Sequence, residues 1–194
     1  MNYLAHLHLA KLSQTSFSGN LMADFCKGSQ IKKLPESLQI GIKMHQFVDK
    51  TLDSHALSVQ FRAEQKIGRR RFAGIVQDLL MDYWLVNRWD ELNSQGLNDF
   101  YAHFLPDLNA HSYLGNEKYQ RLVLSLDRER WLVNLGTLKG LERALNSIIQ
   151  SWRHGEQLLP FYHALPELIE ASEALFDQVY PEMIFAVENC PSHV

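Results

Sequence analysis

Three pairs of polar residues in the first 82 positions are spaced four residues apart, and a histidine precedes them. On an α-helix this spacing places both members of a pair on one face. Three such helices could direct nitrogen and oxygen ligands at one divalent cation. The pairs are Asn20 and Asp24, His45 and Asp49, and Asp78 and Asp82, and the preceding histidine is His6.

A mixture of carboxylate and imidazole ligands is typical of sites for Mn²⁺, Mg²⁺ or Fe²⁺. Hydrolytic sites of this kind leave positions open for water and for substrate oxygens. Several of the acids, such as Asp24 and Asp82, stand among apolar neighbours. A carboxylate there is costly unless a cation pairs with it. The spacing therefore predicts a metal site carried by three consecutive helices.

Each candidate also has a purely structural interpretation. A histidine on an apolar face is more often a core residue than a ligand, Asp49 could pair with a neighbouring lysine, and Asn20 could cap a helix. His8 follows His6 by two residues, which on a helix turns it by about 200° to the other side. We therefore expect only one of the two histidines, His6, to face the site.

Hydrophobic residues recur with the helical period over almost the whole sequence, and strand-like alternation is nearly absent. We predict an all-α fold, a single helical bundle over residues 1–194. Gly28 should end the helix that carries Asn20 and Asp24, and Pro181 should bend or end the last helix. Further helices are expected near 35–51, 55–66, 69–89, 117–134, 137–154, 156–163 and 166–187, with an irregular segment from Pro106 to Gly115.

The composition is that of a folded protein without export or membrane signals. The 194 residues are 46% hydrophobic and 21% charged, enough for one domain with a sizeable core. The N-terminus lacks the basic region of a signal peptide, and no run of about 18 apolar residues predicts a membrane span. Cys26 and Cys190 form no C-x-x-C pair. We therefore expect a reducing compartment, the cytoplasm.

The net charge of −3 argues against a general nucleic-acid binder. The charge is unevenly placed, however, because residues 1–97 carry 12 Lys and Arg against 9 Asp and Glu, whereas residues 98–194 carry 7 against 13. Basic residues concentrate at Lys32, Lys33 and Arg69 to Arg71. They could steer an acidic partner to the site, or they could simply form solvated helix faces.

Four segments carry a resemblance to a known family. They are residues 1–10 (MNYLAHLHLA), 19–25 (GNLMADF), 41–49 (GIKMHQFVD) and 78–82 (DLLMD). Together they closely resemble the bacterial acyl carrier protein phosphodiesterase family. The resemblance covers essentially the whole chain and is most specific over residues 1–50. The sequence departs from the family pattern at Tyr83, where a histidine is usual, and at Gln46 and Phe47, where two arginines are usual.

The resemblance implies an all-helical, metal-dependent phosphodiesterase related to the HD phosphohydrolases. Such an enzyme removes the 4′-phosphopantetheine arm from holo acyl carrier protein and regenerates the apo form. The ion expected is Mn²⁺, with Mg²⁺ or Fe²⁺ as alternatives. Because acyl carrier proteins are acidic, Lys32, Lys33 and Arg69 to Arg71 gain a docking role.

The family pattern assigns roles to the seven polar residues. It implies metal ligands at Asp24, His45, Asp49 and Asp78. The catalytic residues implied are Asp82, His6 and Asn20, where Asp82 or Asp49 takes the proton of the attacking water and His6 protonates the leaving serine oxygen. Two alternatives stay open from the sequence: an HD-like phosphohydrolase acting on a nucleotide or other small phosphodiester, and a non-enzymatic helical adaptor.

Overall fold

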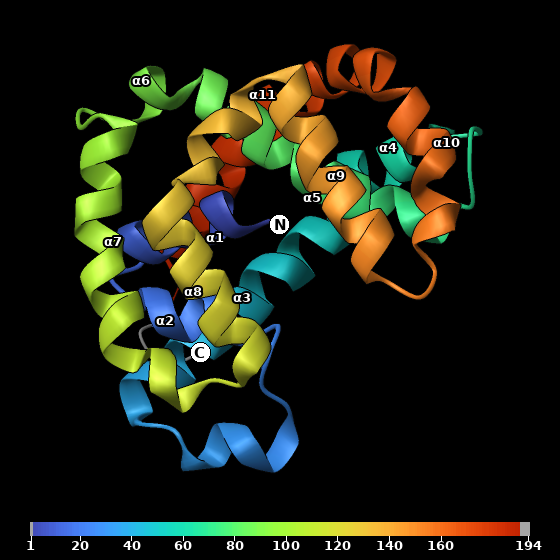
Figure 1. Cartoon of the computed structure of the whole chain (residues 1–194). Helices are drawn as coiled ribbons and strands as arrows, with labels where there is room; N and C mark the ends of the chain where they lie inside the picture. The colour runs from blue at the N-terminus through green and yellow to red at the C-terminus, as the bar shows by residue number, and fades with distance from the viewer. Residues whose placement is uncertain (1, 191–194) are drawn as a thin grey trace.

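The computed structural model describes residues 2–190, and within them every element of regular secondary structure is a helix (Figure 1). The ends of the predicted domain, residue 1 and residues 191–194, lie outside the described residues. The all-α prediction is confirmed. The helices and 3₁₀ helices are, in order, α1 (Tyr3–Leu12), α2 (Phe17–Met22), η1 (Gly28–Lys33), α3 (Glu36–Ser54), α4 (Ala56–Glu64), α5 (Arg70–Asn87), α6 (Trp89–Leu92), α7 (Leu97–His111), η2 (Ser112–Leu114), α8 (Glu117–Glu129), η3 (Trp131–Gly136), α9 (Leu138–Ser151), η4 (Gly155–Leu158), α10 (Leu159–His163) and α11 (Leu165–Glu188).

Helix α1 forms the centre of the structure. Every residue from Leu4 to Ala10 is buried, as expected of a helix that is apolar on all sides. It packs against α2, α3, α5 and α11. In Figure 1, α7 lies at one edge of the molecule and α10 at the other, with the dark blue α1 between them. Residues of α1 are therefore held by neighbours on several sides.

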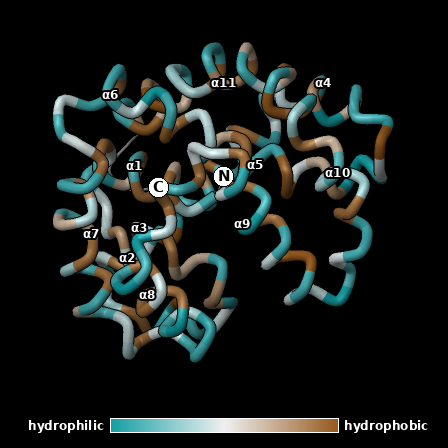
Figure 2. Tube along the Cα trace, turned by 45° about the horizontal axis from the view of Figure 1, so that its top comes forward, coloured by the Kyte–Doolittle hydropathy of each residue, from teal (hydrophilic) through white to brown (hydrophobic). Residues whose placement is uncertain are grey.

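Helices α3 and α5 each turn one face to the core. The buried face of α3 consists of Leu38, Ile42, His45, Val48 and Leu52, among others, so a histidine occupies a position in an otherwise apolar stripe. Figure 2 shows hydrophobic and hydrophilic residues interleaved along the helices, which is the pattern of amphipathic elements. Over residues 2–190, no helix combines the length and the apolarity that crossing a membrane requires.

Neither Pro106 nor Pro181 ends a helix, so the predicted irregular segment after Pro106 and a helix end at Pro181 were both wrong. The segment expected to be irregular after Pro106 is the second half of α7, which continues to His111, and α11 continues past Pro181 to Glu188. A proline removes one helical hydrogen bond. Burial next to it compensates: Leu105 and Leu108 are buried beside Pro106, and Tyr180 and Met183 flank Pro181.

Candidate active site

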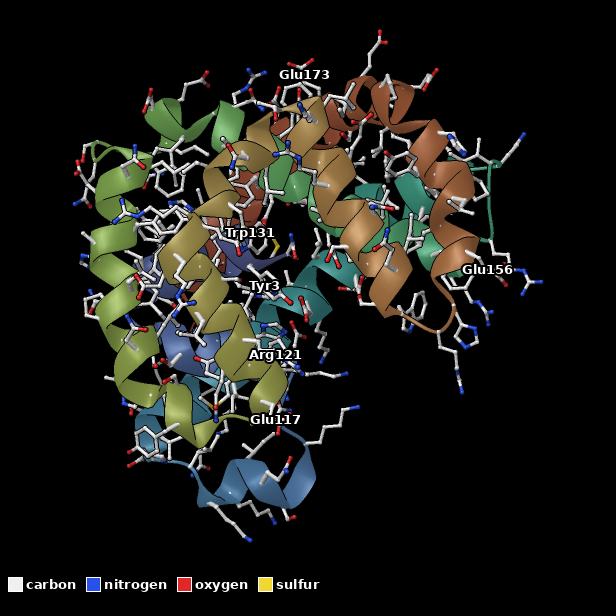
Figure 3. The ribbon with its side chains drawn as sticks, in the orientation of Figure 1. Tyr3, Glu117, Arg121, Trp131, Glu156 and Glu173 are labelled. Atoms are coloured by element: carbon white, nitrogen blue, oxygen red, sulfur yellow. The ribbon has the colours of Figure 1, made fainter. Side chains whose placement is uncertain are left out.

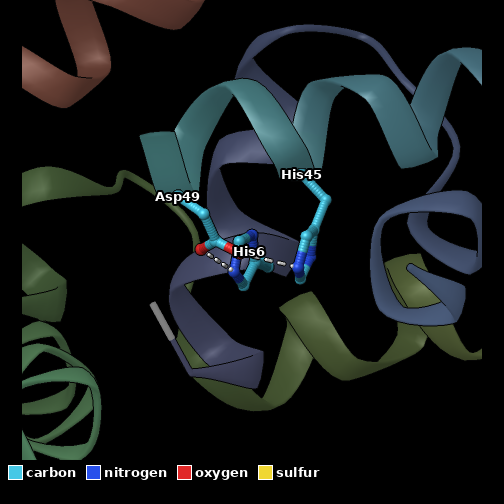
Figure 4. A group of neighbouring side chains, drawn as sticks. All are labelled: His6, His45 and Asp49. Atoms are coloured by element: carbon cyan, nitrogen blue, oxygen red, sulfur yellow. Dashed lines mark ion pairs between the residues drawn. The ribbon is translucent and has the colours of Figure 1, made fainter. Parts of the chain in front are cut away.

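Three of the predicted polar residues meet where α1 crosses α3. His6 Nε2 lies 3.1 Å from Asp49 Oδ1, and His45 Nε2 lies 3.0 Å from Asp49 Oδ2. The two imidazole rings are stacked, with centroids 3.8 Å apart and an interplanar angle of 14°. One ligand atom from each of the three residues falls within 4.8 Å of the others (Figure 4). We call His6, His45 and Asp49 the histidine–aspartate cluster.

The two histidines of α1 point to opposite sides, as the sequence predicted. His6 faces α3, while the ring of His8 bonds the Tyr180 hydroxyl at 2.8 Å and Asn93 Oδ1 at 3.1 Å. His8 is buried, and burial lowers its pKa to about 4. His8 therefore belongs to the packing between α1 and α11.

Helix α3, which carries His45 and Asp49, packs closely against α2. A Cβ atom on Gly19 would lie 2.9 Å from the Gly41 Cα atom and 2.5 Å from the Leu38 carbonyl oxygen. A Cβ atom on Gly41 would lie 2.8 Å from the Ser16 carbonyl oxygen. Both glycines are thus required by backbone proximity, since any side chain would push the helices apart.

Asp24 adjoins the cluster, but from outside a helix. Helix α2 ends at Met22, so the prediction of one helix carrying both Asn20 and Asp24 was wrong. The backbone turns after Met22, and the Asp24 side chain, 49% exposed, brings Oδ1 to 3.5 Å from His45 Nε2. Asp24 is therefore the most solvent-accessible acid in contact with the cluster.

The two histidines of the cluster differ in pKa and therefore in protonation state. Burial opposes protonation of His45, but the Asp24 and Asp49 carboxylates outweigh it and raise the pKa of His45 to about 9. Burial and the positive charge of His45 lower the pKa of His6 to about 3. Burial alone would raise the pKa of Asp49, yet contacts with His45 and His6 hold it well below its usual range. At neutral pH the metal-free cluster contains one imidazolium, one neutral imidazole and one carboxylate.

The buried nitrogen atoms of the cluster fit a metal. Among the described residues, none hydrogen-bonds either ring nitrogen of His6 or Nδ1 of His45, although all three atoms are buried. His6 Nε2 has an ion-pair contact with Asp49 Oδ1 at 3.1 Å. A buried polar atom without a hydrogen-bond partner lowers the free energy of unfolding. Two imidazoles and a carboxylate around one point are a donor set suited to a divalent transition-metal ion.

Asp78 approaches the same region from α5. Burial raises the pKa of Asp78, and the negative charges of Asp49 and Asp53 raise it further. The effect of Asp49 places the two carboxylates within electrostatic range of each other. The residues whose ligand atoms gather around one point are His6, His45 and Asp49, so a ligand role for Asp78 stays a prediction.

Comparison with known proteins identifies the chain. The family model described as "Acyl carrier protein phosphodiesterase" matches residues 1–183. The chain belongs to the acyl carrier protein phosphodiesterase family. Proteins of that name from Photorhabdus laumondii and Yersinia enterocolitica are 34% and 33% identical to it, over 97% of this chain and 96% and 98% of theirs. One from Escherichia coli (strain 536) is 32% identical, over 95% of this chain and 96% of its own. No solved structure matches, and the similarity to HD phosphohydrolases stays a prediction.

Asp82, the second acid of the family's D-x-x-x-D segment, is used elsewhere. It is fully buried, and its two oxygens accept hydrogen bonds from the backbone N–H groups of Leu4 and Ala5, both at 2.9 Å. It therefore holds the N-terminus of α1, where Asn2 makes no side-chain cap. Burial raises the pKa of Asp82 to about 7 despite these two bonds. The helix that carries His6 is positioned by this carboxyl group.

Asn20 is buried in α2. Its Nδ2 donates to Thr15 Oγ1 and to the Ser16 carbonyl oxygen, both at 2.9 Å. Its Oδ1 is buried and accepts no hydrogen bond from the described residues. The Asn20 amide group thus stabilises the start of α2 through Nδ2, while its Oδ1 atom has no hydrogen-bond donor among the described residues.

The basic residues do not form one patch. Lys32 and Lys33 are exposed at the end of η1, whereas Arg69 to Arg71 are exposed at the start of α5. Figure 1 shows η1 (light blue) and the segment before α5 (teal) at two separate extremities of the molecule. A docking role for both groups in this family would require a partner that spans the distance between them.

Sequence reasoning missed Tyr3, which is part of the same region. Its ring packs edge-on against Trp131, with centroids 6.1 Å apart. Burial, followed by the negative charges of Asp24 and Asp82, raises the pKa of Tyr3 to about 12. Tyr3 precedes His6 by three residues and so shares its helix face, a signal that could have indicated it.

Proposed function

We propose that this chain is a divalent-metal-dependent phosphodiesterase that releases 4′-phosphopantetheine from holo acyl carrier protein and leaves the serine free. The observation that carries the proposal is the histidine–aspartate cluster, with its buried, unbonded imidazole nitrogens, in a chain of this family. The relatives named above are called acyl carrier protein phosphodiesterases. Family membership supports the substrate, and the cluster supports the chemistry.

His6, His45 and Asp49 would hold the cation, with Asp24 and Asp78 beside them. A bound cation would supply charge for the phosphodiester oxygens and lower the pKa of the attacking water. Two imidazoles favour Mn²⁺ or Fe²⁺ over Mg²⁺, which prefers oxygen ligands. We propose Mn²⁺.

The protein's own groups are prepared for this chemistry. His6 is neutral at physiological pH because its pKa is about 3, so a nitrogen lone pair is available. His45 must give up a proton to act as a ligand. Asp24 is ionised and half exposed, and we assign it the proton of the attacking water. Asp82 accepts two backbone hydrogen bonds, which makes it a positioning residue in this scheme.

The substrate arrives as an acidic protein, and the compartment we propose is the cytoplasm. Both Cys26 and Cys190 are free, in keeping with a reducing environment. Exposed Lys32 and Lys33, or exposed Arg69 to Arg71, would meet the acidic surface of the carrier protein.

Mass spectrometry tests the function directly. Holo acyl carrier protein incubated with this protein and Mn²⁺ should lose the mass of the phosphopantetheine arm, and no loss should occur with a chelator or with Asp49→Ala. Purified protein should also retain a stoichiometric metal ion. If the metal-loaded enzyme leaves holo acyl carrier protein intact but hydrolyses a nucleotide phosphodiester, the proposal is wrong. The chain is then a phosphohydrolase of small molecules. Absence of bound metal and of any hydrolysis would leave a helical adaptor.

A further inference from the structure

A cavity of about 570 Å³ lies between α8, η3, α9 and the start of α1. Its volume falls within the range of about 300–1,000 Å³ found for small-molecule sites. Tyr3 and Trp131 form part of its wall, and Figure 3 shows the two side chains one above the other beside the opening that α9 borders.

The cavity and the cluster share two walls. Tyr3 lies one helical turn before His6 on α1, and Leu79, which also lines the cavity, directly follows Asp78 on α5. The hydroxyl of Tyr3 lies in the field of Asp24, which contacts His45. A ligand whose phosphate lies at the cluster could therefore extend past Tyr3 and Leu79 into the cavity.

The lining suits a long uncharged chain with scattered polar groups. Leu79, Leu122, Trp131 and Ile148 supply apolar surface. Hydroxyl and amide groups alternate with them, from Tyr3, Ser125, Asn134 and Ser147. Among the described lining residues Arg143 is the single cation and Glu129 the single anion, and both are exposed. A polyphosphate ligand would call for more positive charge.

We propose that this cavity binds the pantetheine part of the substrate, with the phosphate at the histidine–aspartate cluster and the thiol end along α9. Pantetheine has two amides, a hydroxyl group and a dimethyl-substituted carbon, and it carries no charge. These groups match the mixture of hydroxyl, amide and apolar side chains in the wall. The inference rests on the proposed function, because it takes the prosthetic arm as the ligand.

Helix α9 offers matched positions for a test. Ala144, Ser147 and Ser151 line the cavity at spacings of three and four residues, which is one face of the helix. Asn146 and Gln150 are exposed on the same helix, as Ser147 and Ser151 are, and they are absent from the lining. Gly140 also lines the cavity but is unsuitable, since a Cβ atom there would lie 1.8 Å from the Asn134 carbonyl oxygen.

The test uses thiol exchange with 4′-phosphopantetheine, which carries the same arm and ends in a thiol. Ser147→Cys, Ser151→Cys, Asn146→Cys and Gln150→Cys are each made in a Cys190→Ser background, loaded with Mn²⁺ and converted to the pyridyl disulfide. The arm thiolate attacks the cysteine sulfur, the mixed disulfide forms, and thiopyridone leaves and is measured by absorbance. Cysteamine, a small thiol without the arm, measures the intrinsic reactivity of each position.

We expect the rate ratio of phosphopantetheine to cysteamine to be at least tenfold higher at positions 147 and 151 than at 146 and 150. Equal ratios at all four positions would overturn the inference. As a second measurement, Ser147→Trp should lower kcat/KM for holo acyl carrier protein at least tenfold, while Asn146→Trp should not. Failure of the wild type to release the arm would refute the proposed function instead, and the exchange ratios would still decide whether the cavity binds the arm.

Discussion

Removal of metal should make the stability of this protein depend on the protonation of His45. The side chain is 5% exposed and touches two carboxylates, and its pKa is about 9 against 6.5 for an unperturbed histidine. The folded state therefore binds the proton more tightly than the unfolded state does. Its contribution to the free energy of unfolding is fully present below pH 6.5 and is lost as the pH rises through about 9.

The size of the effect follows from the shift. Each pKa unit corresponds to about 1.4 kcal/mol, so the full contribution is about 3 kcal/mol, of which about 2 kcal/mol disappears between pH 7 and pH 9. For a chain of this length that is a fall in Tm of roughly 4–8 °C. Asp82 contributes little in this window because its pKa is about 7 and its ionisation is mostly complete above that pH.

The assay is thermal or urea unfolding of chelator-treated protein at half-unit steps of pH. His45→Gln is the matched variant, since glutamine fills a similar space but does not titrate, and its Tm should change far less over the same window. With saturating Mn²⁺ the fall between pH 7 and pH 9 should largely disappear, because metal binding displaces the His45 proton and its affinity rises about tenfold per pH unit below pH 9, which offsets the lost proton contribution. A metal-free wild type as flat as His45→Gln would refute the charge assignment of the cluster.

Four further outcomes are expected. Asp78→Ala should abolish arm release while circular dichroism shows unchanged helicity; wild-type turnover would remove Asp78 from the metal site. Asp82→Ala should cost about 2–4 kcal/mol in urea unfolding, because two buried N–H groups of α1 lose their acceptor; a change within about 0.5 kcal/mol would contradict the anchoring role. Gly41→Ala should cost about 1–3 kcal/mol and weaken Mn²⁺ binding in calorimetry, since α2 and α3 must separate; unaltered Mn²⁺ affinity would mean that the helices adjust without moving the ligands. Reversing the charges of Arg69 to Arg71, or separately of Lys32 and Lys33, should raise KM for the carrier protein more than it lowers kcat, in a salt-dependent way, and a KM insensitive to salt in the wild type would argue against both groups.

The helices and the centre of the site could be predicted from the sequence because both depend on local periodicity. His45 and Asp49 fall on one face of α3 for this reason, and His6 was separated from His8 by the same geometry. Spacing failed where the backbone stops being helical, as between Asn20 and Asp24. It also could not distinguish Asp82, whose carboxyl accepts bonds from residues 77 and 78 positions away; such long-range contacts leave no local pattern.

The cluster and the cavity come from different parts of the chain. His6, His45 and Asp49 all lie within the first 49 residues, whereas nearly all of the cavity wall, apart from Asn2, Tyr3 and Leu79, lies between residues 122 and 151. Under the proposal that the cavity binds the arm, substitutions on the cavity-lining face of α9 would change the accepted ligand and leave His6, His45 and Asp49 in place. For protein engineering, α9 is the place to diversify.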